Sequence, residues 1–322
     1  MNTSPTHTPH AEASSQKNQP HPSETTRKAT AGMADTIDRR SMRTLWQKYL
    51  RKVTTSPLSV AVSVLILVFF TAITLMTPLI EPIGLAQNLA LGVSPAGSAG
   101  HILGTDNLGR DVLFLSLAGT RSALIGPLVI AAGSMLIGLF FGVTAAWRGG
   151  LWDSTVSRTC EILLAMPVTL LAIVVAGILG GGYWVTVAVL ILLFAPSDIR
   201  MVRAATLQQI PKPYIESALL LGIPTRRILA VHIVPNITPI VWANLFLNVA
   251  FALVSLSGLS YLGFGVSAQA ADWGRQLADG RAFIYQNPAA TLIPGILIVL
   301  AAAAINIAGD YCALRAEERT KI

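Results

Sequence analysis

The chain has 322 residues, of which 53% are hydrophobic and only 12% are charged. Soluble domains carry about 25% charged residues, so the polar surface that a water-soluble protein of this size requires is missing. The apolar content also excludes a disordered chain, and glycine shows no three-residue period, which excludes a collagen-like one. The composition therefore indicates a helical integral membrane protein.

Charged residues are absent from five long windows of the sequence. A helix needs about 20 apolar residues to cross a bilayer, and four of the windows each hold one such span. The remaining window, 162–197, is long enough for two spans and is interrupted at 180–182, where three glycines favour a turn. The sequence thus predicts six transmembrane helices, in the windows 57–80, 122–147, 162–197, 237–271 and 282–309.

The distribution of lysine and arginine predicts the orientation. If the N-terminus is cytoplasmic, the inside segments hold 19 of the 23 basic residues, which is the bias that cytoplasmic loops carry. Both chain ends are then cytoplasmic. This bias also explains the net charge of +7, and the excess is not clustered on one face as nucleic-acid binding requires. The inside segments are 1–56, 148–161, 198–236 and 310–322.

Four regions follow along the chain. Residues 1–40 are rich in Thr, Ser, Pro, His and Gln, which predicts a disordered cytoplasmic tail, and the irregular spacing of its histidines does not favour a metal site. Residues 41–80 combine a basic amphipathic segment with the first transmembrane helix. Residues 81–121 form an extracytoplasmic segment, and 122–315 form a five-helix core that contains a cytoplasmic loop at 205–236.

Several activities are excluded or disfavoured. The chain has no G-x-x-x-x-G-K-[ST] and no G-x-S-x-G, so it lacks a P-loop for ATP and a nucleophile elbow. The five windows contain no Asp, Glu, Lys, Arg or His, which disfavours a proton relay but leaves sodium coupling through backbone carbonyls open. We expect neither a catalytic residue nor a bound cofactor or metal in this chain.

A few polar residues do fall within the predicted spans. Asn244 and Asn248 lie four residues apart on one helix, and Ser255 follows them. Such residues either hydrogen-bond neighbouring helices or line a substrate path. The first interpretation is favoured for each residue, and Asn248 is the best candidate for path lining.

The cytoplasmic loop predicts two short helices joined at a glycine. Pro213 suits a first helical turn, 214–221 favour helix, and Gly222 ends it in the left-handed conformation. A second helix restarts after Pro224 at Arg226 and Arg227. Tyr214, Ala218 and Leu221 are expected on one face, with Ser217 and Ala218 small enough for a partner to approach closely. The alternative is an amphipathic hairpin that lies on the membrane.

This loop resembles the EAA loop of ABC importer permeases. The resemblance rests on Glu216, Ser217 and Ala218, on Gly222 four residues later, and on Pro235, with Ser217 standing where the family has alanine. In that family the loop is the coupling helix, which sits in a groove of the ATPase subunit. The resemblance therefore implies that this chain docks an ATPase through Tyr214, Glu216, Ser217, Ala218, Leu221, Gly222, Pro224, Arg226, Arg227 and Pro235.

Two outer stretches narrow the resemblance to the C-type permease subunit of dipeptide, oligopeptide and nickel importers. Residues 101–111 match its H-x-x-G-T-D-x-x-G-R-D segment through Gly104, Thr105, Asp106, Gly109, Arg110 and Asp111. Trp273 and Gly274 match its W-G block. Physically, Thr105 or Asp106 can N-cap a short helix, and Asp106 can pair with Arg110 at i,i+4.

The resemblance implies an all-α polytopic protein of the bacterial cytoplasmic (inner) membrane, with the type I ABC importer permease fold of six transmembrane helices and cytoplasmic coupling helices. It implies a heterodimer with a second permease subunit, two ABC ATPase subunits that bind ATP and magnesium, and an extracytoplasmic solute-binding protein. The implied substrates are dipeptides or oligopeptides. Nickel or another small solute is the alternative, and a channel or an ion-coupled transporter is a remote one.

Overall fold

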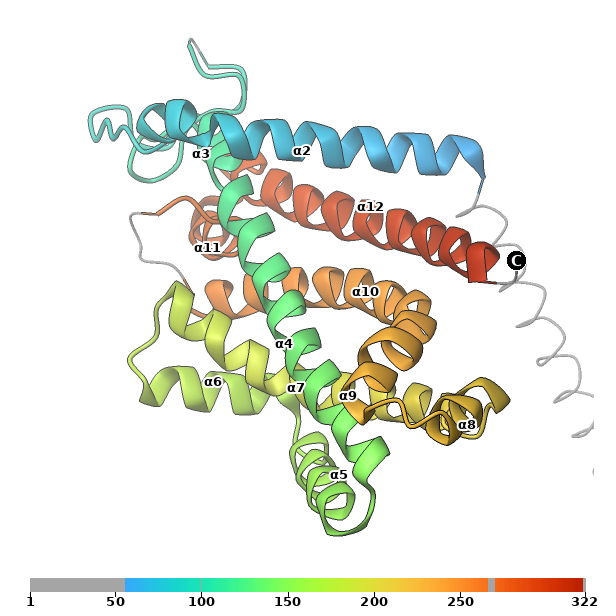
Figure 1. Ribbon diagram of the computed structural model, residues 1–322. Coiled ribbons are helices and arrows are strands. Elements are labelled where there is room, and N and C mark those ends of the chain that lie inside the picture. The colour runs from blue at the N-terminus through green and yellow to red at the C-terminus, as the bar shows by residue number, and fades with distance from the viewer. Residues whose placement is uncertain (1–55, 99, 266–269, 321–322) are drawn as a thin grey trace, which may run out of the picture. The chain divides into compact units, whose positions relative to one another are not determined.

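The computed structural model describes residues 56–98, 100–265 and 270–320, which belong to the compact unit Thr54–Ile322. The predictions for the tail 1–40 and for the amphipathic segment up to residue 55 lie outside the described residues. Within them the regular secondary structure is helical, and β-structure is limited to the isolated bridges Ser98–His101 and Thr105–Asp111. The predicted all-α fold is confirmed (Figure 1).

The described residues contain five stretches of helix long and apolar enough to cross a membrane, and a bent helix pair provides a sixth if it is counted as one span. The prediction of six spans agrees with this upper number. The last helix begins seven residues later than its charge-free window, and it continues beyond the end of that window. The long helices are α2 (Pro57–Gly84), α4 (Thr120–Arg148), α7 (Tyr183–Gln209), α10 (Val234–Tyr261) and α12 (Ala289–Thr320).

The bent pair consists of α5 (Gly150–Leu164) and α6 (Val168–Ile178), which meet at 89°. The sequence placed a continuous span from residue 162, and the structure corrects this boundary. Pro167 is the N-cap of α6. Because proline has no N–H to donate to the carbonyl four residues earlier, α5 cannot continue through this position. The predicted glycine turn is confirmed, since all three glycines that separate α6 from α7 have positive φ angles of 69° to 101°.

The helices pack around α4 and α10. Helix α4 lies along α7 and α10, while α10 also contacts α12, and α2 lies beside α12 (Figure 1). Small residues let the backbones approach closely, as is usual between membrane helices. A Cβ atom at Gly138 would lie 2.6 Å from the Cβ of Asp198, and one at Gly142 would lie 2.8 Å from the Ile199 carbonyl oxygen.

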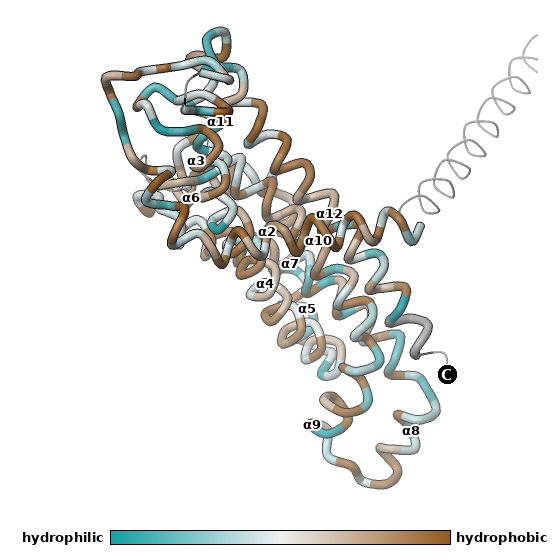
Figure 2. The backbone as a smooth tube through the Cα atoms, turned by 90° about the horizontal axis from the view of Figure 1, so that it is seen from above, coloured by the Kyte–Doolittle hydropathy of each residue, from teal (hydrophilic) through white to brown (hydrophobic). Residues whose placement is uncertain are grey.

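Short helices lie at the two ends of this bundle. One end carries α3 (Val112–Ala118) and α11 (Trp273–Gly280), which the 3₁₀ turn Arg281–Phe283 follows. The opposite end carries α8 (Pro213–Leu220) and α9 (Thr225–Arg227) (Figure 2). A π-helical turn, Ile228–Ile233, joins α9 to α10. The two groups of residues that the sequence singled out therefore lie at opposite ends of the membrane helices.

Candidate functional site

The loop between α7 and α10 forms the predicted pair of short helices. Helix α8 begins with Pro213 at its first position and has Glu216 in its first turn, where a negative charge is favourable. Gly222 has a φ of 71°, its N–H donates to the Leu219 carbonyl at 3.0 Å, and the Ile223 N–H donates to the Ala218 carbonyl at 3.1 Å. These two bonds are the Schellman ending of a helix. The glycine elbow is confirmed.

One face of α8 anchors the loop to the rest of the chain. Ile215 and Ala218 are buried together with Ile228 and Ile233 of the π-helical turn, and Trp147 at the end of α4 packs against this cluster. The prediction that Ala218 shares a partner-facing surface with Tyr214 and Leu221 is wrong on this point. Ala218 lies on the same side as the larger Ile215, three residues away, and that side faces inward.

The opposite side of the loop is exposed. Leu220 is 90% exposed and Leu221 is 79% exposed, beside the exposed Leu219. Tyr214 is only partly buried, which raises the pKa of its hydroxyl, and this hydroxyl donates to Gln209 Oε1 at 2.9 Å. An exposed apolar tip framed by charges is typical of a protein or membrane interaction surface. The polar residues and prolines exposed around it are Glu216, Ser217, Pro224, Arg226, Arg227 and Pro235.

A buried carboxyl group connects the two membrane helices that flank this loop. The sequence placed Asp198 in a cytoplasmic segment, but α7 continues to Gln209 and Asp198 is fully buried among the helices. Asn244 and Asn248 of α10 both donate to its Oδ1, at 2.6 and 2.7 Å. The other oxygen, Oδ2, has no hydrogen-bond partner among the described residues.

The expectation that the membrane spans contain no ionisable residue is therefore wrong, because Asp198 lies among the membrane helices. The signal was present as an Asp one residue beyond a charge-free window and two asparagines spaced i,i+4 on another span. The two asparagines bond α7 to α10, as favoured from the sequence. Ser255 is half-buried on the same helix. Asn244 also lines a cavity of about 300 Å³ with Asn306 and Asp310 of α12.

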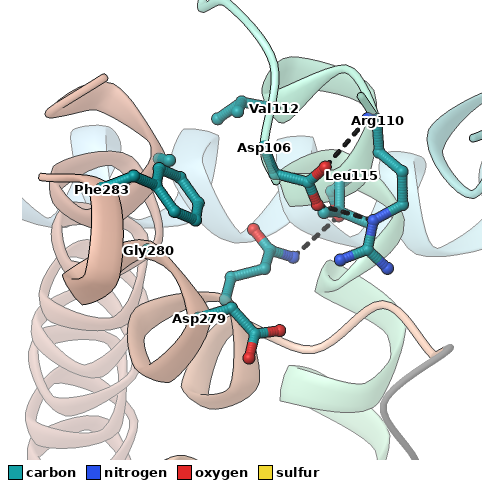
Figure 3. A pocket seen from close by; sticks show the side chains of 9 residues that line it. Asp106, Arg110, Val112, Leu115, Asp279, Gly280 and Phe283 are labelled. Carbon is teal, nitrogen blue, oxygen red and sulfur yellow. Dashed lines mark hydrogen bonds and ion pairs between the residues drawn. The ribbon is translucent and has the colours of Figure 1, made fainter. Parts of the chain in front are cut away.

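The outer motif at 101–111 folds around a buried ion pair, as Figure 3 shows. The Arg110 Nε lies 2.6 Å from Asp106 Oδ2, and the backbone N–H groups of Leu108 and Arg110 each donate to Oδ1 at 2.9 Å. The predicted pair is confirmed. The predicted N-cap is wrong, because the Asp106 oxygens are occupied in this way. Asp111 caps α3 instead, accepting from the backbone N–H of Leu113 at 2.8 Å.

Glycines let this loop approach the chain before it. Gly104 and Gly109 have φ angles of 73° and 68°, and a Cβ at either position would collide with the carbonyl of Ser94 or Asn88. Thr105 donates to the Gly92 carbonyl at 2.7 Å. The residues of this motif therefore build a fixed outer layer.

The W-G block attaches α11 to this layer. Trp273 is fully buried and donates its indole N–H to the Ser116 carbonyl at 2.7 Å. A Cβ at Gly274 would collide with the Ser257 backbone of α10. Asp272 caps α11 by accepting from the Arg275 N–H at 3.0 Å, and burial raises the pKa of its carboxyl group. Helices α3, α10 and α11 are thereby locked together at the outer end.

Comparison with known proteins identifies the class. Residues 134–321 match the family described as binding-protein-dependent transport system inner membrane component. The glutathione transport system permease protein GsiD of Pectobacterium atrosepticum is 31% identical, over 88% of this chain and 94% of its own. The oligopeptide transport system permease protein OppC of Bacillus subtilis is 29% identical, over 88% and 92%. The chain belongs to this family of inner-membrane permease components.

A solved structure supports the fold. An inward-facing conformation of the MetNI methionine ABC transporter aligns with a TM-score of 0.53 and 21% identity, over 63% of this chain and 97% of that one. The predicted ABC importer permease fold is therefore confirmed. The chain is a multi-pass inner-membrane component of a binding-protein-dependent transport system, which makes it a transport subunit and not an enzyme.

Proposed function

We propose that this chain is one half of a heterodimeric permease that imports dipeptides or oligopeptides, with two ATPase subunits and an extracytoplasmic binding protein. The observation that carries the proposal is the similarity to GsiD over 88% of the chain. The di/tripeptide permease DppC of Pseudomonas aeruginosa, 32% identical over 66% of this chain and 71% of its own, supports the same substrate class. ATP and magnesium would bind to the partner subunits.

The exposed side of α8 and α9 is the proposed ATPase-docking surface. It presents Leu220, Leu221 and the Arg226–Arg227 pair at the end of the bundle opposite α3 and α11. The basic residues near this end support a cytoplasmic location by the positive-inside rule, and the proposed orientation has both chain ends in the cytoplasm. The buried inner face of α8 holds the loop in one conformation, so its exposed side can bind a partner.

Movement of the docking surface would reach the membrane helices directly. Helix α7 leads into α8, and α10 follows α9 after the π-helical turn. Because Asn244 and Asn248 bond α10 to Asp198 of α7, a displacement of the loop would move both helices together. Asn244, Asn248 and Ser255 remain candidates for lining the path between α10 and its neighbours.

Uptake into proteoliposomes tests the substrate. The full complex, reconstituted with its binding protein and internal ATP, is expected to accumulate labelled dipeptide or oligopeptide and not nickel. Accumulation of nickel without peptide would replace the proposed substrate, and uptake without ATP would contradict the ABC importer assignment.

Cysteine cross-linking tests the docking surface. In a background with Cys312 replaced by serine, Ser217→Cys on α8 is expected to cross-link to an ATPase subunit through a short bifunctional reagent. The matched control is Ala282→Cys, which is exposed at the opposite end. Cross-linking of the control but not of Ser217→Cys would contradict this docking site.

A further inference from the structure

The charged residues at the outer end are almost all paired within the chain. Among the described residues, nine Asp, Glu and Arg side chains belong to the segments on this side of the membrane helices. Seven of these side chains contact a partner within the chain or cap a helix. The pairs and contacts are Asp106–Arg110, His101–Asp111, Arg275–Asp279, Asp272 with the Arg275 N–H, and Arg281 over the Tyr261 ring. The two exceptions are Glu81 and Arg121.

Glu81 and Arg121 line the same cavity. It has a volume of about 290 Å³ and lies between the outer ends of α2, α4 and α7. Glu81 is half-buried in the last turn of α2, and Arg121 is exposed at the second position of α4. Neither side chain forms an ion pair or hydrogen bond with any described residue. The cavity therefore presents one free carboxylate and one free guanidinium that are not joined to each other.

The remaining wall is largely apolar and combines the rings of Tyr183 and Trp184 with Ala118, Ile125, Ala270 and Ala271. Tyr183 and Trp184 begin α7, with ring centroids 5.1 Å apart, and Trp184 is 61% exposed. The Tyr183 hydroxyl is already used, because it donates to the Ser122 carbonyl at 2.6 Å. The rings therefore offer apolar faces, which can also attract a cation. A volume near 300 Å³ is at the lower end of the range for small-molecule pockets.

We propose that this cavity binds the zwitterionic form of a short peptide, with the ammonium group at Glu81 and the carboxylate at Arg121. Arginine presents a planar pair of donors that matches a carboxylate, and a free glutamate is the natural partner of an ammonium group. The proposal rests on the peptide substrate proposed above and adds a recognition site in the permease itself. A zwitterionic phospholipid headgroup shares this chemistry, so the experiment separates the two sources.

Equilibrium dialysis of labelled alanyl-alanine tests the site. The assembled permease and ATPase complex is used without its binding protein, in nanodiscs of phosphatidylglycerol alone. Compared with the free dipeptide, N-acetyl-alanyl-alanine lacks the ammonium group and alanyl-alanine amide lacks the carboxylate. Each of these blocked peptides is expected to bind about tenfold or more weakly than the free dipeptide, as befits a lost charge-assisted hydrogen bond.

Variants assign each end of the peptide. Glu81→Gln is expected to weaken binding of the free and amidated peptides and to leave the acetylated one unchanged. Arg121→Gln is expected to weaken the free and acetylated peptides and to leave the amidated one unchanged. The matched control is Arg281→Gln, which removes an exposed outer charge that does not line the cavity. The double variant Glu81→Arg with Arg121→Glu is expected to recover binding of the free dipeptide.

Three results would overturn the proposal. The first is equal binding of the three peptides by the wild-type complex, and the second is equal weakening of all three peptides by either variant. The third is that the dipeptide does not bind in phosphatidylglycerol nanodiscs, whereas phosphatidylethanolamine occupies the cavity. The last result would assign the site to a lipid headgroup. ATP-driven peptide uptake that persists in any of these cases leaves the proposed function intact, so the two failures are distinguishable.

Discussion

Two buried aspartates illustrate how the outer layer and the membrane interior of this protein differ. Asp106 in the outer layer accepts two backbone N–H groups and pairs with Arg110, whose whole side chain is also buried. Asp198 in the membrane interior receives two amide donors on a single oxygen, and no cation pairs with it among the described residues. Asp106 in the outer layer is therefore held by an ion pair, whereas Asp198 in the interior acts only as a hydrogen-bond acceptor.

The difference follows from the cost of burying charge. Removing one member of a buried ion pair leaves an uncompensated charge, so such a pair must stay complete. Between apolar helices, polar groups contribute hydrogen bonds of modest strength, about 0.6–2 kcal/mol each. Asp198 is thus a connector between α7 and α10, while Asp106 and Arg110 hold the outer loop in one conformation.

The largest expected effect comes from breaking the outer pair. Arg110→Ala is expected to lower the free energy of unfolding by about 3–5 kcal/mol, because it leaves the Asp106 carboxylate buried without its cation. Thermal unfolding of the assembled complex measures this. The control is Arg275→Ala, since the Arg275–Asp279 pair is partly exposed and such pairs contribute about 0–1 kcal/mol. Equal losses in both variants would contradict the role of the buried pair.

An intermediate effect is expected from the membrane connector. Asp198→Ala leaves both asparagine amides without an acceptor and is expected to lower the free energy of unfolding by about 1–3 kcal/mol. Asp198→Asn keeps an oxygen acceptor and is expected to recover most of that loss. If Asp198→Asn is as damaging as Asp198→Ala, the carboxylate charge matters and the contrast with Asp106 fails.

The smallest expected effect concerns Asp272, a buried carboxyl group that caps α11. Because burial raises its pKa, the folded state favours the protonated form, and its contribution to stability falls as the pH rises from the usual aspartate value through the raised one. Asparagine caps a helix equally well, so Asp272→Asn is expected to change stability by about 1 kcal/mol or less and to remove this pH dependence. Unfolding temperatures from pH 4 to pH 7 measure it, and an unchanged pH profile would contradict the assignment.

Several features could be predicted from the sequence because they depend on local chemistry. Pro213 and Gly222 determine where α8 begins and ends through their own backbone preferences, and the charge-free windows locate the long helices. The spacing of Asp106 and Arg110 likewise places their side chains within reach of each other. These predictions needed no knowledge of how distant segments pack.

Other features depend on contacts between distant segments. A charge-free window ends where its first charged residue stands, so Asp198 was assigned to the cytoplasm, although Asn244 and Asn248 allow it to be buried. The inward side of α8 depends on Trp147, which is 68 residues away from Ile215. Thr105, the other predicted cap, is unavailable because its hydroxyl donates to the Gly92 carbonyl and accepts from the Ser94 N–H. Hydrophobic pattern alone does not contain this information.

Substrate-stimulated ATP hydrolysis by the purified complex tests the central claim most directly, namely that the α8–α9 loop couples this permease to its ATPase. Gly222→Pro cannot adopt the φ of 71° that ends α8, and Glu216→Ala removes an exposed charge beside the apolar tip. We predict that both variants assemble and retain basal ATP hydrolysis but lose most of the stimulation by the peptide-loaded binding protein. Wild-type stimulation in both variants would contradict the claim.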